Sequence, residues 1–554
     1  MKRDLTRLAG REFDLVIVGG GIYGACAAWD ATLRGLSVAL LERGDFGHAT
    51  SANSLKLVHG GFRYMQHADI VRIRQSSHER TTLLRIAPHL VHPIPFAIPT
   101  YGHGMRGKEI LASALLLYNL VSVGHNRGLN DREKRIPFGH LLSRDECVEL
   151  FPEIERKGLT GAVVFYDGQM HAPPRLVYSF VASAAVAGAE VANYTEVTGF
   201  LGDATRVTGV RARDAFTGDE FEVRSRLVLN TSGPWAAEIL ERCANHRVTP
   251  PVRFSKDWYL VVNRALVDRH ALAVPSHHTD PNAIVSRGRR HLFLIPWRGR
   301  SLIGSSHVPY RGTADEFAIT EEDLQELLNE INDCYPAAAL TRSDISFCYA
   351  GLVPMDDEGD ESADVKLGRR HRTIDHQREH GLGGLVTIVG VRFTTSRYVA
   401  RKTIDLVFRR MGRRPLASRT DTVPLIGGDI ENFSEFSARE MKVAPNGLHP
   451  DLVAHLLQTY GTRYREVLQS CGDEPDLLEP LDGSSVIRAE VSYAVRAEMA
   501  LKLSDVVFRR TDLGTAGHPG APALRACAAL MAEELGWDET RVQEELSEVE
   551  ETYP

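Results

Sequence analysis

A glycine-rich segment near the start of the chain has the residue types and spacing needed to hold a diphosphate. It reads FDLVIVGGGIYG, so that an apolar run meets Gly19, Gly21 and Gly24. Gly19 permits a tight turn, Gly21 lets the backbone approach a diphosphate, and Gly24 lets a helix pack closely on a sheet. Glu42 ends the next apolar run, near the usual spacing for a carboxylate that binds a ribose hydroxyl. These residues together predict a dinucleotide site.

Three further loops carry small, hydroxyl-bearing or charged residues that a ligand can contact. They are ATSANSLKLVHGGFRY, the turn of LVLNTSGPWA and the end of VGVRFTTSR. The candidate cofactor-binding residues in these loops are Thr50, Ser51, Lys56, His59, Gly60, Gly61, Ser232, Gly233, Gly390, Arg392 and Thr394. The glycine fingerprint alone leaves open whether the dinucleotide is NAD or FAD, because both contain an adenosine diphosphate half.

Short strands and helices must position these loops. The order apolar strand, glycines, proline-free helix and second strand is that of a Rossmann βαβ unit. Strand-like runs rich in Val, Ile and Leu occupy 15–18, 38–41, 227–229, 292–295, 301–303 and 385–389. Ser143 with Glu146 and Thr320 with Asp323 have the spacing of capping boxes, so we expect a helix to begin after each serine or threonine. The pattern predicts an α/β fold with a mixed-sheet substrate domain.

Chain length indicates at least two packed units. The chain has 554 residues, whereas single hydrophobic cores stop growing at roughly 250–300 residues. After Pro424 the sequence turns to helical patterns with few strand signals, ending in an acidic amphipathic helix around Val542 and Val549. We therefore expect a discontinuous cofactor and substrate region over 12–425 and a C-terminal helical domain over 430–554.

Charge and cysteine content exclude several classes of protein. Lys and Arg number 65 against 72 Asp and Glu, so the net charge of −7 disfavours nucleic-acid binding through bulk charge. The seven cysteines form no CxxC pair, so the sequence indicates neither a disulfide framework nor a zinc site, and no metal is expected. The first residues show no signal-peptide cleavage pattern and are interpreted as a mature N-terminus in a reducing, cytoplasmic compartment.

The longest apolar stretch, 110–123, is shorter than the roughly 20 residues that a transmembrane helix requires. It is compatible with a core helix or with a helix lying in a membrane interface. The sequence leaves open a peripheral contact at the inner face of the cytoplasmic membrane, and also a homo-oligomer.

These segments, in this order, resemble the FAD-dependent glycerol-3-phosphate dehydrogenases, within the D-amino-acid-oxidase-like flavoproteins. The resemblance runs through GGGIYG, ATSANSLKLVHGGFRY, LSRDECVELFPEI, NTSGPWA, FLIPW and FTTSR, and continues into VRAEMALKLSDVVFRRTDLG near the C-terminus. It implies FAD as cofactor and oxidation of sn-glycerol-3-phosphate to dihydroxyacetone phosphate, with electrons passed to a quinone-type acceptor.

The resemblance also implies catalytic positions, some of which differ here. Tyr259 stands where the family has a histidine, in the segment that begins at Lys256, and Val353 stands where it has a substrate-binding arginine. Arg392 replaces a family lysine, while Arg370 matches a family arginine. Val353 cannot make the charge-assisted bond to phosphate, so Arg370 and Arg392 are the expected anion contacts. Tyr259 is a poorer base than histidine, so the expected base is His59 or Lys256.

Two alternatives follow from these departures. A flavoenzyme of the same fold could oxidise another hydroxy compound or an amine, since Tyr259 and Val353 both alter the substrate positions. An FAD-binding sensor or assembly subunit without turnover is the other alternative, because the base position has changed. Oxidation of glycerol-3-phosphate with an artificial electron acceptor would distinguish a glycerol-3-phosphate dehydrogenase from both alternatives.

Overall fold

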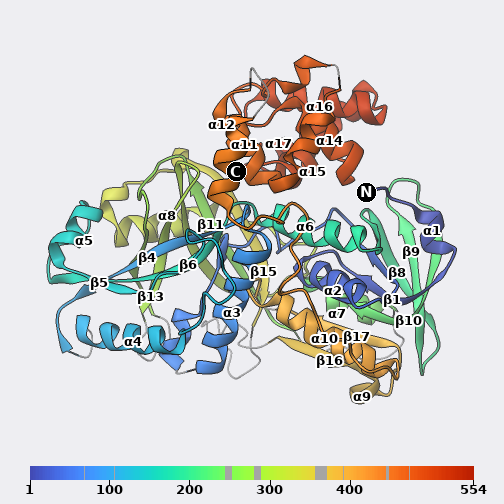
Figure 1. Cartoon of the computed structure of the whole chain (residues 1–554), viewed down its shortest axis with the longest axis horizontal. Helices are drawn as coiled ribbons and strands as arrows, with labels where there is room; N and C mark the ends of the chain where they lie inside the picture. The colour runs from blue at the N-terminus through green and yellow to red at the C-terminus, as the bar shows by residue number, and fades with distance from the viewer. Residues whose placement is uncertain are drawn as a thin grey trace.

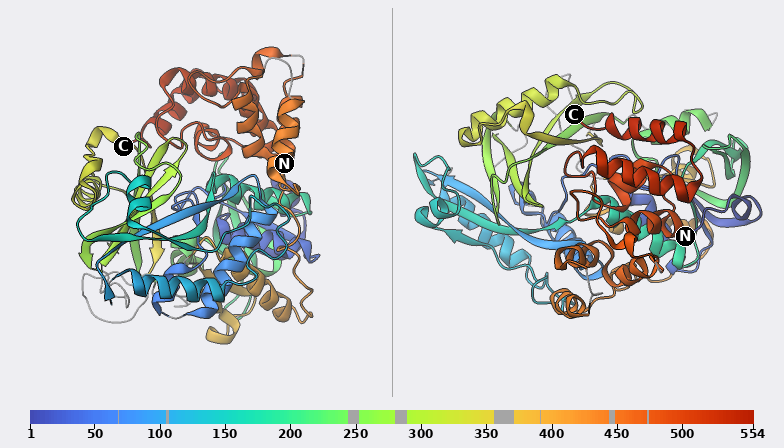
Figure 2. Two further views of the ribbon diagram at one scale, coloured as in Figure 1. Left: turned by 60° about the vertical axis from the view of Figure 1, so that its left-hand side comes forward. Right: turned by 90° about the horizontal axis from the view of Figure 1, so that it is seen from above.

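The computed structural model describes residues 1–67, 69–104, 107–243, 252–279, 289–355, 371–390, 392–443, 448–472 and 474–554. Figure 1 shows two twisted β-sheets side by side, flanked by helices, with a group of C-terminal helices above them. The turned views of Figure 2 keep these helices on the same side of the sheets. The α/β fold class with a helical C-terminal region is confirmed.

The first sheet carries the glycine-rich motif. Its strands are β1 (Glu12–Val18), β2 (Val38–Leu41), β7 (Glu190–Ala192), β8 (Thr195–Gly202), β9 (Val207–Asp214), β10 (Glu220–Asn230), β16 (Arg372–Asp375) and β17 (Leu385–Val389). They pair in the order β16-β17-β10-β1-β2-β7, and β9 and β8 extend the sheet from β10. The central strands from β17 to β7 run parallel, so their carboxyl ends meet at one edge. Ligands of such sheets bind outside this edge.

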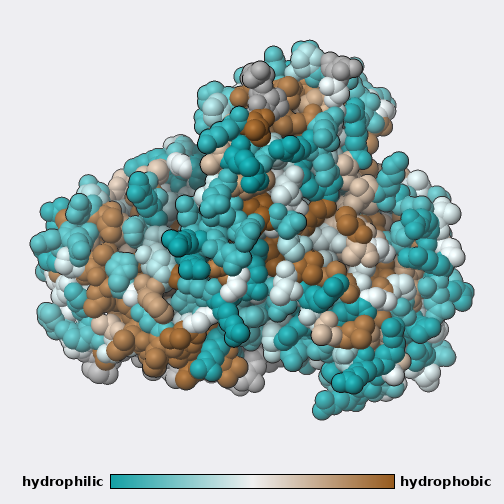
Figure 3. Space-filling view, in the orientation of Figure 1, coloured by the Kyte–Doolittle hydropathy of each residue, from teal (hydrophilic) through white to brown (hydrophobic). Residues whose placement is uncertain are grey.

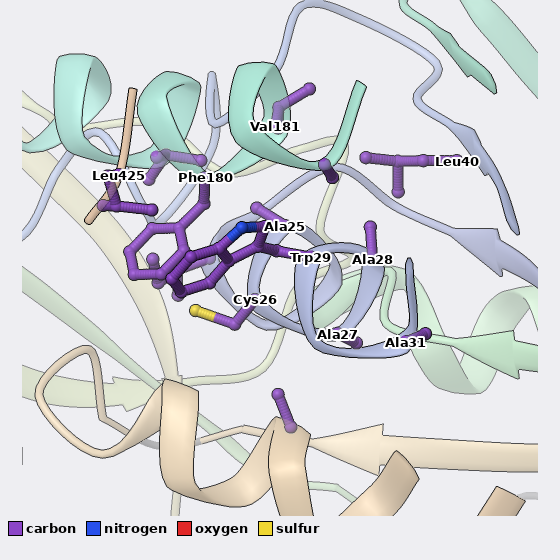
Figure 4. Close-up of a cluster of buried hydrophobic side chains, with 14 of the residues drawn as sticks. Ala25, Cys26, Ala27, Ala28, Trp29, Ala31, Leu40, Phe180, Val181 and Leu425 are labelled. Atoms are coloured by element: carbon purple, nitrogen blue, oxygen red, sulfur yellow. The ribbon is translucent and has the colours of Figure 1, made fainter. Parts of the chain in front are cut away.

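An interior helix connects β1 to β2. This helix, α2 (Ile22–Leu33), lies between α6 (Pro173–Val186) and α10 (Ser396–Arg410). Figure 4 shows its alanines facing both neighbours, while Trp29 and Phe180 meet edge to face with ring centroids 5.5 Å apart. The small side chains allow close packing on both sides, and this fixes the N-terminus of α2 at the strand edge.

The second sheet is mostly antiparallel. Its strands are β3 (Leu57–Val58), β4 (Val91–Tyr101), β5 (His140–Leu142), β6 (Leu159–Met170), β11 (Phe254–Val262), β12 (Ala271–Thr279), β13 (Arg289–Trp297), β14 (Arg300–Tyr310) and β15 (Ile345–Pro354). They follow the order β15-β11-β14-β13-β12-β4-β6-β3, with β5 on β6. The mixed-sheet character comes from the parallel pair β12 and β4.

The local predictions agree with the structure. Each predicted strand lies within a strand or coincides with one. Both predicted capping boxes are present, at the start of α5 (Arg144–Leu150) and of α8 (Glu321–Cys334). The remaining helices of the two-sheet body are α1 (Leu5–Ala9), α3 (Ile70–Ile86), α4 (Lys108–Val121), α7 (Ala236–Cys243) and α9 (His376–His380).

The described residues of the C-terminal region form helices and turns and no β-strand. Its helices are α11 (Phe433–Lys442), α12 (Pro450–Tyr460), α13 (Tyr464–Gln469), α14 (Arg488–Glu498), α15 (Leu503–Asp505), α16 (Ala521–Leu535) and α17 (Glu539–Glu550), and a π-helical turn spans Val506–Arg510. The boundaries of the two regions, 12–425 for the cofactor and substrate region and 430–554 for the C-terminal domain, stay a prediction.

Buried ion pairs attach this region to the first sheet. Arg510 donates two hydrogen bonds of 2.7 Å to the carboxylate of Asp45, three residues beyond Glu42, and Arg509 donates a third of 2.7 Å. Arg175 on α6 binds Glu498 through hydrogen bonds of 2.5 and 2.7 Å. Such bidentate, charge-assisted bonds fix orientation as well as distance.

Candidate active site

The three motif glycines differ in what a side chain would meet. Gly19 has a φ of +99°, and a Cβ there would lie 2.8 Å from the Thr231 carbonyl oxygen. A Cβ on Gly24 would lie 1.9 Å from the Gly19 carbonyl oxygen, so Gly24 is required for packing. At Gly21 a Cβ would meet only Ser51 Oγ within 4 Å, at 3.2 Å. The space beside Gly21 is therefore kept open for something other than protein.

Glu42 closes the same site from β2. Its Oε2 accepts a hydrogen bond from Gly20 N–H at 2.6 Å, and its Oε1 accepts one from Gly44 N–H at 2.9 Å. The carboxylate thus lies at the end of β2 against the glycine turn, where a ribose hydroxyl would be bound. Ser51 Oγ accepts from Ile22 N–H at 3.0 Å at the first turn of α2.

A cleft between the two sheets brings most of the predicted residues together. It begins at the carboxyl ends of β1, β2, β10 and β17 and continues to β11 and β15. The predicted residues that line it are Gly19, Gly21, Glu42, Thr50, Ser51, Ser232, Gly233, Tyr259, Gly390 and Arg392. Those that do not line it are Gly24, Lys56, His59, Gly60, Gly61, Lys256 and Thr394. Arg370 lies outside the described residues.

The loop of His59 is attached to the rim of this cleft. Thr394 Oγ1 accepts a hydrogen bond from His59 N–H at 3.1 Å, so Thr394 holds the backbone of His59. His59 Nδ1 lies 3.1 Å from Asp167 Oδ2, and the side chain of His59 is 51% exposed. Gly61, with a φ of +94°, lets the chain turn into the helical segment that follows. The second ring nitrogen of His59 is left for other partners.

Lys56 does not take the predicted position beside the cofactor. Its backbone is left-handed, with a φ of 59°, and its side chain is buried. The Nζ atom lies 3.7 Å from the ring centroid of Tyr349 and 4.5 Å from that of Trp297. Burial, with a smaller contribution from Arg298, holds the pKa of Lys56 well below its ordinary value. The aromatic enclosure, rather than the cleft, is the partner of this amine.

Lys256 and Tyr259 also lack the surroundings of a catalytic base. Lys256 Nζ forms an ion pair of 2.6 Å with Asp323, at the start of α8. Tyr259 lines the cleft, but its hydroxyl donates to the Ser54 carbonyl oxygen at 2.6 Å. Burial, and then the neighbouring Tyr349, raise the pKa of Tyr259 well above its ordinary value. The base role predicted for Lys256 does not fit this geometry, and the hydroxyl of Tyr259 already donates to a backbone carbonyl.

We expect Tyr259→Phe to keep the enzyme active. The hydroxyl only supports the Ser54 carbonyl, so its loss should cost about 0.5–1.5 kcal/mol of stability. The kcat should stay within about threefold of the parent, whereas loss of a general base costs roughly 100-fold or more. Thermal unfolding and steady-state kinetics measure the two effects, and a hundredfold lower kcat would restore Tyr259 as a catalytic residue.

The positively charged Arg392 lines the cleft near Gly390. The Tyr23 hydroxyl lies 2.9 Å from the Arg392 carbonyl oxygen and 3.0 Å from its N–H, which anchors the backbone. The Arg392 guanidinium lies 4.8 Å from the ring centroid of Tyr64. Val353 lines the same cleft. An anionic substrate would therefore meet Arg392 on one side and an apolar side chain at the position of Val353.

Sequence reasoning missed two contributors to the site. Asp167 orients His59, and Tyr23 holds the Arg392 backbone. Tyr23 stands inside the glycine motif and could have been noticed there. No local pattern links Asp167 to His59, because the two residues are 108 positions apart in the sequence.

The arrangement fits a dinucleotide. Gly21 leaves room for a diphosphate at the N-terminus of α2, and Glu42 lies where a ribose hydroxyl would be bound. The cleft continues to Arg392 and Phe393, and the next residue, Thr394, accepts a hydrogen bond from His59 N–H, so the His59 loop lies next to the lining. The chemistry that these residues allow is oxidation of a small, anionic substrate.

Comparisons with known proteins agree with this geometry. The family described as FAD dependent oxidoreductase matches residues 14–406, and the C-terminal domain of alpha-glycerophosphate oxidase matches residues 418–542. The chain is 31% identical to glycerol-3-phosphate dehydrogenase from Synechocystis, over 99% of this chain and 98% of that protein. It is 33% identical to the protein of the same name from Mycobacterium leprae, over 98% and 88% of the two chains.

A solved structure has the same fold. Glycerol-3-phosphate dehydrogenase from Bacillus halodurans, complexed with FAD, superposes with a TM-score of 0.75 over 99% of this chain and 95% of that one, at 24% identity. FAD as the cofactor and an oxidoreductase activity follow from the family and from the glycine cradle together. The chain therefore belongs to the FAD-dependent glycerol-3-phosphate dehydrogenase family of FAD-dependent oxidoreductases.

Proposed function

We propose that this enzyme oxidises sn-glycerol-3-phosphate to dihydroxyacetone phosphate and passes the electrons to a quinone. The observation that carries the proposal is the similarity to relatives named glycerol-3-phosphate dehydrogenase, which extends through both the oxidoreductase region and the C-terminal helices. The position of Arg392 in the cleft supports an anionic substrate.

The residues of the chain divide the work of this reaction. Gly19, Gly21 and the N-terminus of α2 bind the diphosphate of FAD, and Glu42 binds its ribose. When bound, FAD supplies the acceptor for the hydride of the alcohol. Arg392 binds the phosphate of the substrate, and His59 accepts the proton of the C2 hydroxyl. Arg370, predicted as a second phosphate contact, remains part of this proposal.

The visible spectrum of the purified protein tests the proposal directly. The protein should be yellow, and glycerol-3-phosphate added without oxygen should bleach the flavin absorbance. Glycerol serves as the matched control, since it has the same alcohol without the phosphate. A flavin that is bleached by uncharged alcohols or by amines, but not by glycerol-3-phosphate, would favour a second candidate function, the oxidation of another hydroxy compound or an amine. The apolar Val353, which lines the cleft at a substrate position, motivates this candidate.

The quinone part of the proposal rests on an apolar surface. Figure 3 shows a hydrophobic patch at the lower left, over α4. On α4 only Leu115 and Tyr118 are buried, whereas Leu116 is 72% and Leu120 68% exposed. Within the described ranges, no helix is both long and apolar enough to cross a bilayer. We infer that α4 lies in the membrane interface, where a lipid-dissolved quinone is available.

Polar residues on this helix should weaken membrane binding. Burying a leucine in an apolar phase contributes about 1.5–3 kcal/mol, so Leu116→Asn with Leu120→Asn should reduce binding to phosphatidylglycerol-containing vesicles by at least tenfold. Val186→Asn is the matched control, because Val186 is 74% exposed but lies at the end of α6. Vesicle cosedimentation measures the change. If the double variant, the Val186→Asn control and the parent protein bind the vesicles equally well, α4 does not lie in the membrane interface.

A further inference from the structure

The loop that carries His59 is held in place at several points. His59 N–H donates to Thr394 Oγ1 at 3.1 Å, and Ser77 Oγ donates to the Gly60 carbonyl at 2.8 Å. Gly60 N–H donates to Asp167 Oδ1 at 2.5 Å. A Cβ on Gly60 would lie 1.9 Å from Nη1 of Arg80, so the glycine is needed for the arginine to pass behind the loop. The backbone position of His59 is therefore fixed before any substrate binds.

Asp167 has a different neighbour for each carboxylate oxygen. Oδ1 accepts from Gly60 N–H and from Arg80 Nη1, the latter at 3.2 Å, while Oδ2 faces His59 Nδ1 at 3.1 Å. The side chains of Asp167 and Arg80 are 4% and 0% exposed, so their ion pair is shielded from solvent. An ionised carboxylate only accepts hydrogen bonds, so the hydrogen between Asp167 and His59 must be on Nδ1.

We propose that Asp167, held by Arg80, is the positioning residue that keeps His59 in the tautomer with Nε2 free to accept the substrate proton. A neutral imidazole carries one hydrogen, so a hydrogen on Nδ1 leaves Nε2 with its lone pair. Asp167 then also stabilises the imidazolium that forms when Nε2 takes the hydroxyl proton. The inference rests on the proposed function, since it assigns the device that prepares His59 for that reaction.

The local donors make Asp167→Asn a sharp test. Gly60 N–H and Arg80 Nη1 are both donors, so they select the amide oxygen of an asparagine. Its NH₂ group then faces His59 Nδ1 and favours the tautomer with hydrogen on Nε2, which cannot accept a proton. We expect kcat to fall by roughly 100- to 10,000-fold with flavin retained and KM changed little.

A double-mutant cycle separates positioning from general structural support. In a His59→Gln background, Asp167→Asn should lower kcat by no more than about threefold, because the group through which it acts is gone. The control is Asp214→Asn, which removes a carboxylate that is similarly buried and paired with Arg3 but lies outside the cleft. It should lower the melting temperature and keep kcat. Equal losses from Asp167→Asn in both backgrounds, or no loss in either, would overturn the proposal.

The tautomer can also be observed without altering Asp167. In ¹⁵N-histidine spectra of the wild-type holoenzyme, with His59→Gln used to assign the signals, neutral His59 should carry its hydrogen on Nδ1. A neutral ring with the hydrogen on Nε2 would overturn the proposal even if the Asp167 variant fails to fold. An inactive wild type with the expected tautomer would instead count against the substrate assignment and leave the Asp167–His59 pair standing.

Discussion

Replacing Gly21 with valine should give a folded chain that purifies almost without flavin. A Cβ at this position meets only Ser51 Oγ within 4 Å, so the protein itself can accommodate the change, but the diphosphate loses its path to the N-terminus of α2. Each charged hydrogen bond lost costs about 1.5–3 kcal/mol, so FAD affinity should fall by at least tenfold. The ratio of flavin to protein absorbance and a titration with FAD measure the loss.

Two other glycines serve as controls. Gly199→Val should keep its flavin, because a Cβ on Gly199 makes only ordinary contacts with Arg211, at 3.6 and 3.9 Å. Gly24→Val should destabilise the chain itself, since its Cβ would collide with the Gly19 carbonyl. A yellow Gly21→Val protein with normal FAD affinity would show that the diphosphate is bound elsewhere.

Arg392→Ala should produce the second large effect, on substrate oxidation. A phosphate bound by this guanidinium would lose a bond of about 1.5–3 kcal/mol, which corresponds to a roughly 10- to 150-fold loss in kcat/KM. Because Arg392 adjoins Gly390 in the cleft, we expect kcat to fall as well as KM to rise. Steady-state kinetics with glycerol-3-phosphate measure both parameters, and glycerol should be oxidised equally by parent and variant.

Adding a cation at position 353 complements the removal of the cation at position 392. Val353 lines the same cleft, so Val353→Arg adds a second cation and should lower the KM for glycerol-3-phosphate. Unchanged kinetics in both variants would mean that no phosphate is bound between residues 353 and 392. That outcome would favour an uncharged alcohol or an amine as the substrate.

The parts of the site that local sequence determines could be predicted. The strand, glycine turn and helix at Gly19–Gly24 depend on neighbours in the chain, and the structure places Glu42 against that turn. The capping boxes at Ser143 and Thr320 are equally local, and both are present. Short-range spacing is enough in these cases because the interacting groups are a few residues apart or joined by one βαβ unit.

The parts of the site that could not be predicted depend on contacts between segments that are distant in the sequence. Lys56 follows the hydroxyl-rich loop, yet its left-handed backbone directs the amine to Tyr349 and Trp297. Asp167 reaches His59 because β3 pairs with β6, a register that no spacing in the sequence reveals. Tyr259 stands where the family has a histidine, but only the structure shows that its hydroxyl donates a hydrogen bond to the Ser54 carbonyl oxygen.

The ion pair between Arg510 and Asp45 couples the C-terminal helices to the loop that follows β2. Asp45 belongs to the loop that follows Glu42, but its countercharges, Arg509 and Arg510, come from beyond residue 500. Removing one partner of a buried ion pair costs roughly 3–5 kcal/mol, a large share of the stability of a typical domain. A shortened chain ending near residue 425 would retain every cofactor contact named above and still lack the charges that hold the loop after Glu42. We therefore expect the loop after Glu42 to reach its final form only after the last part of the chain has been synthesised.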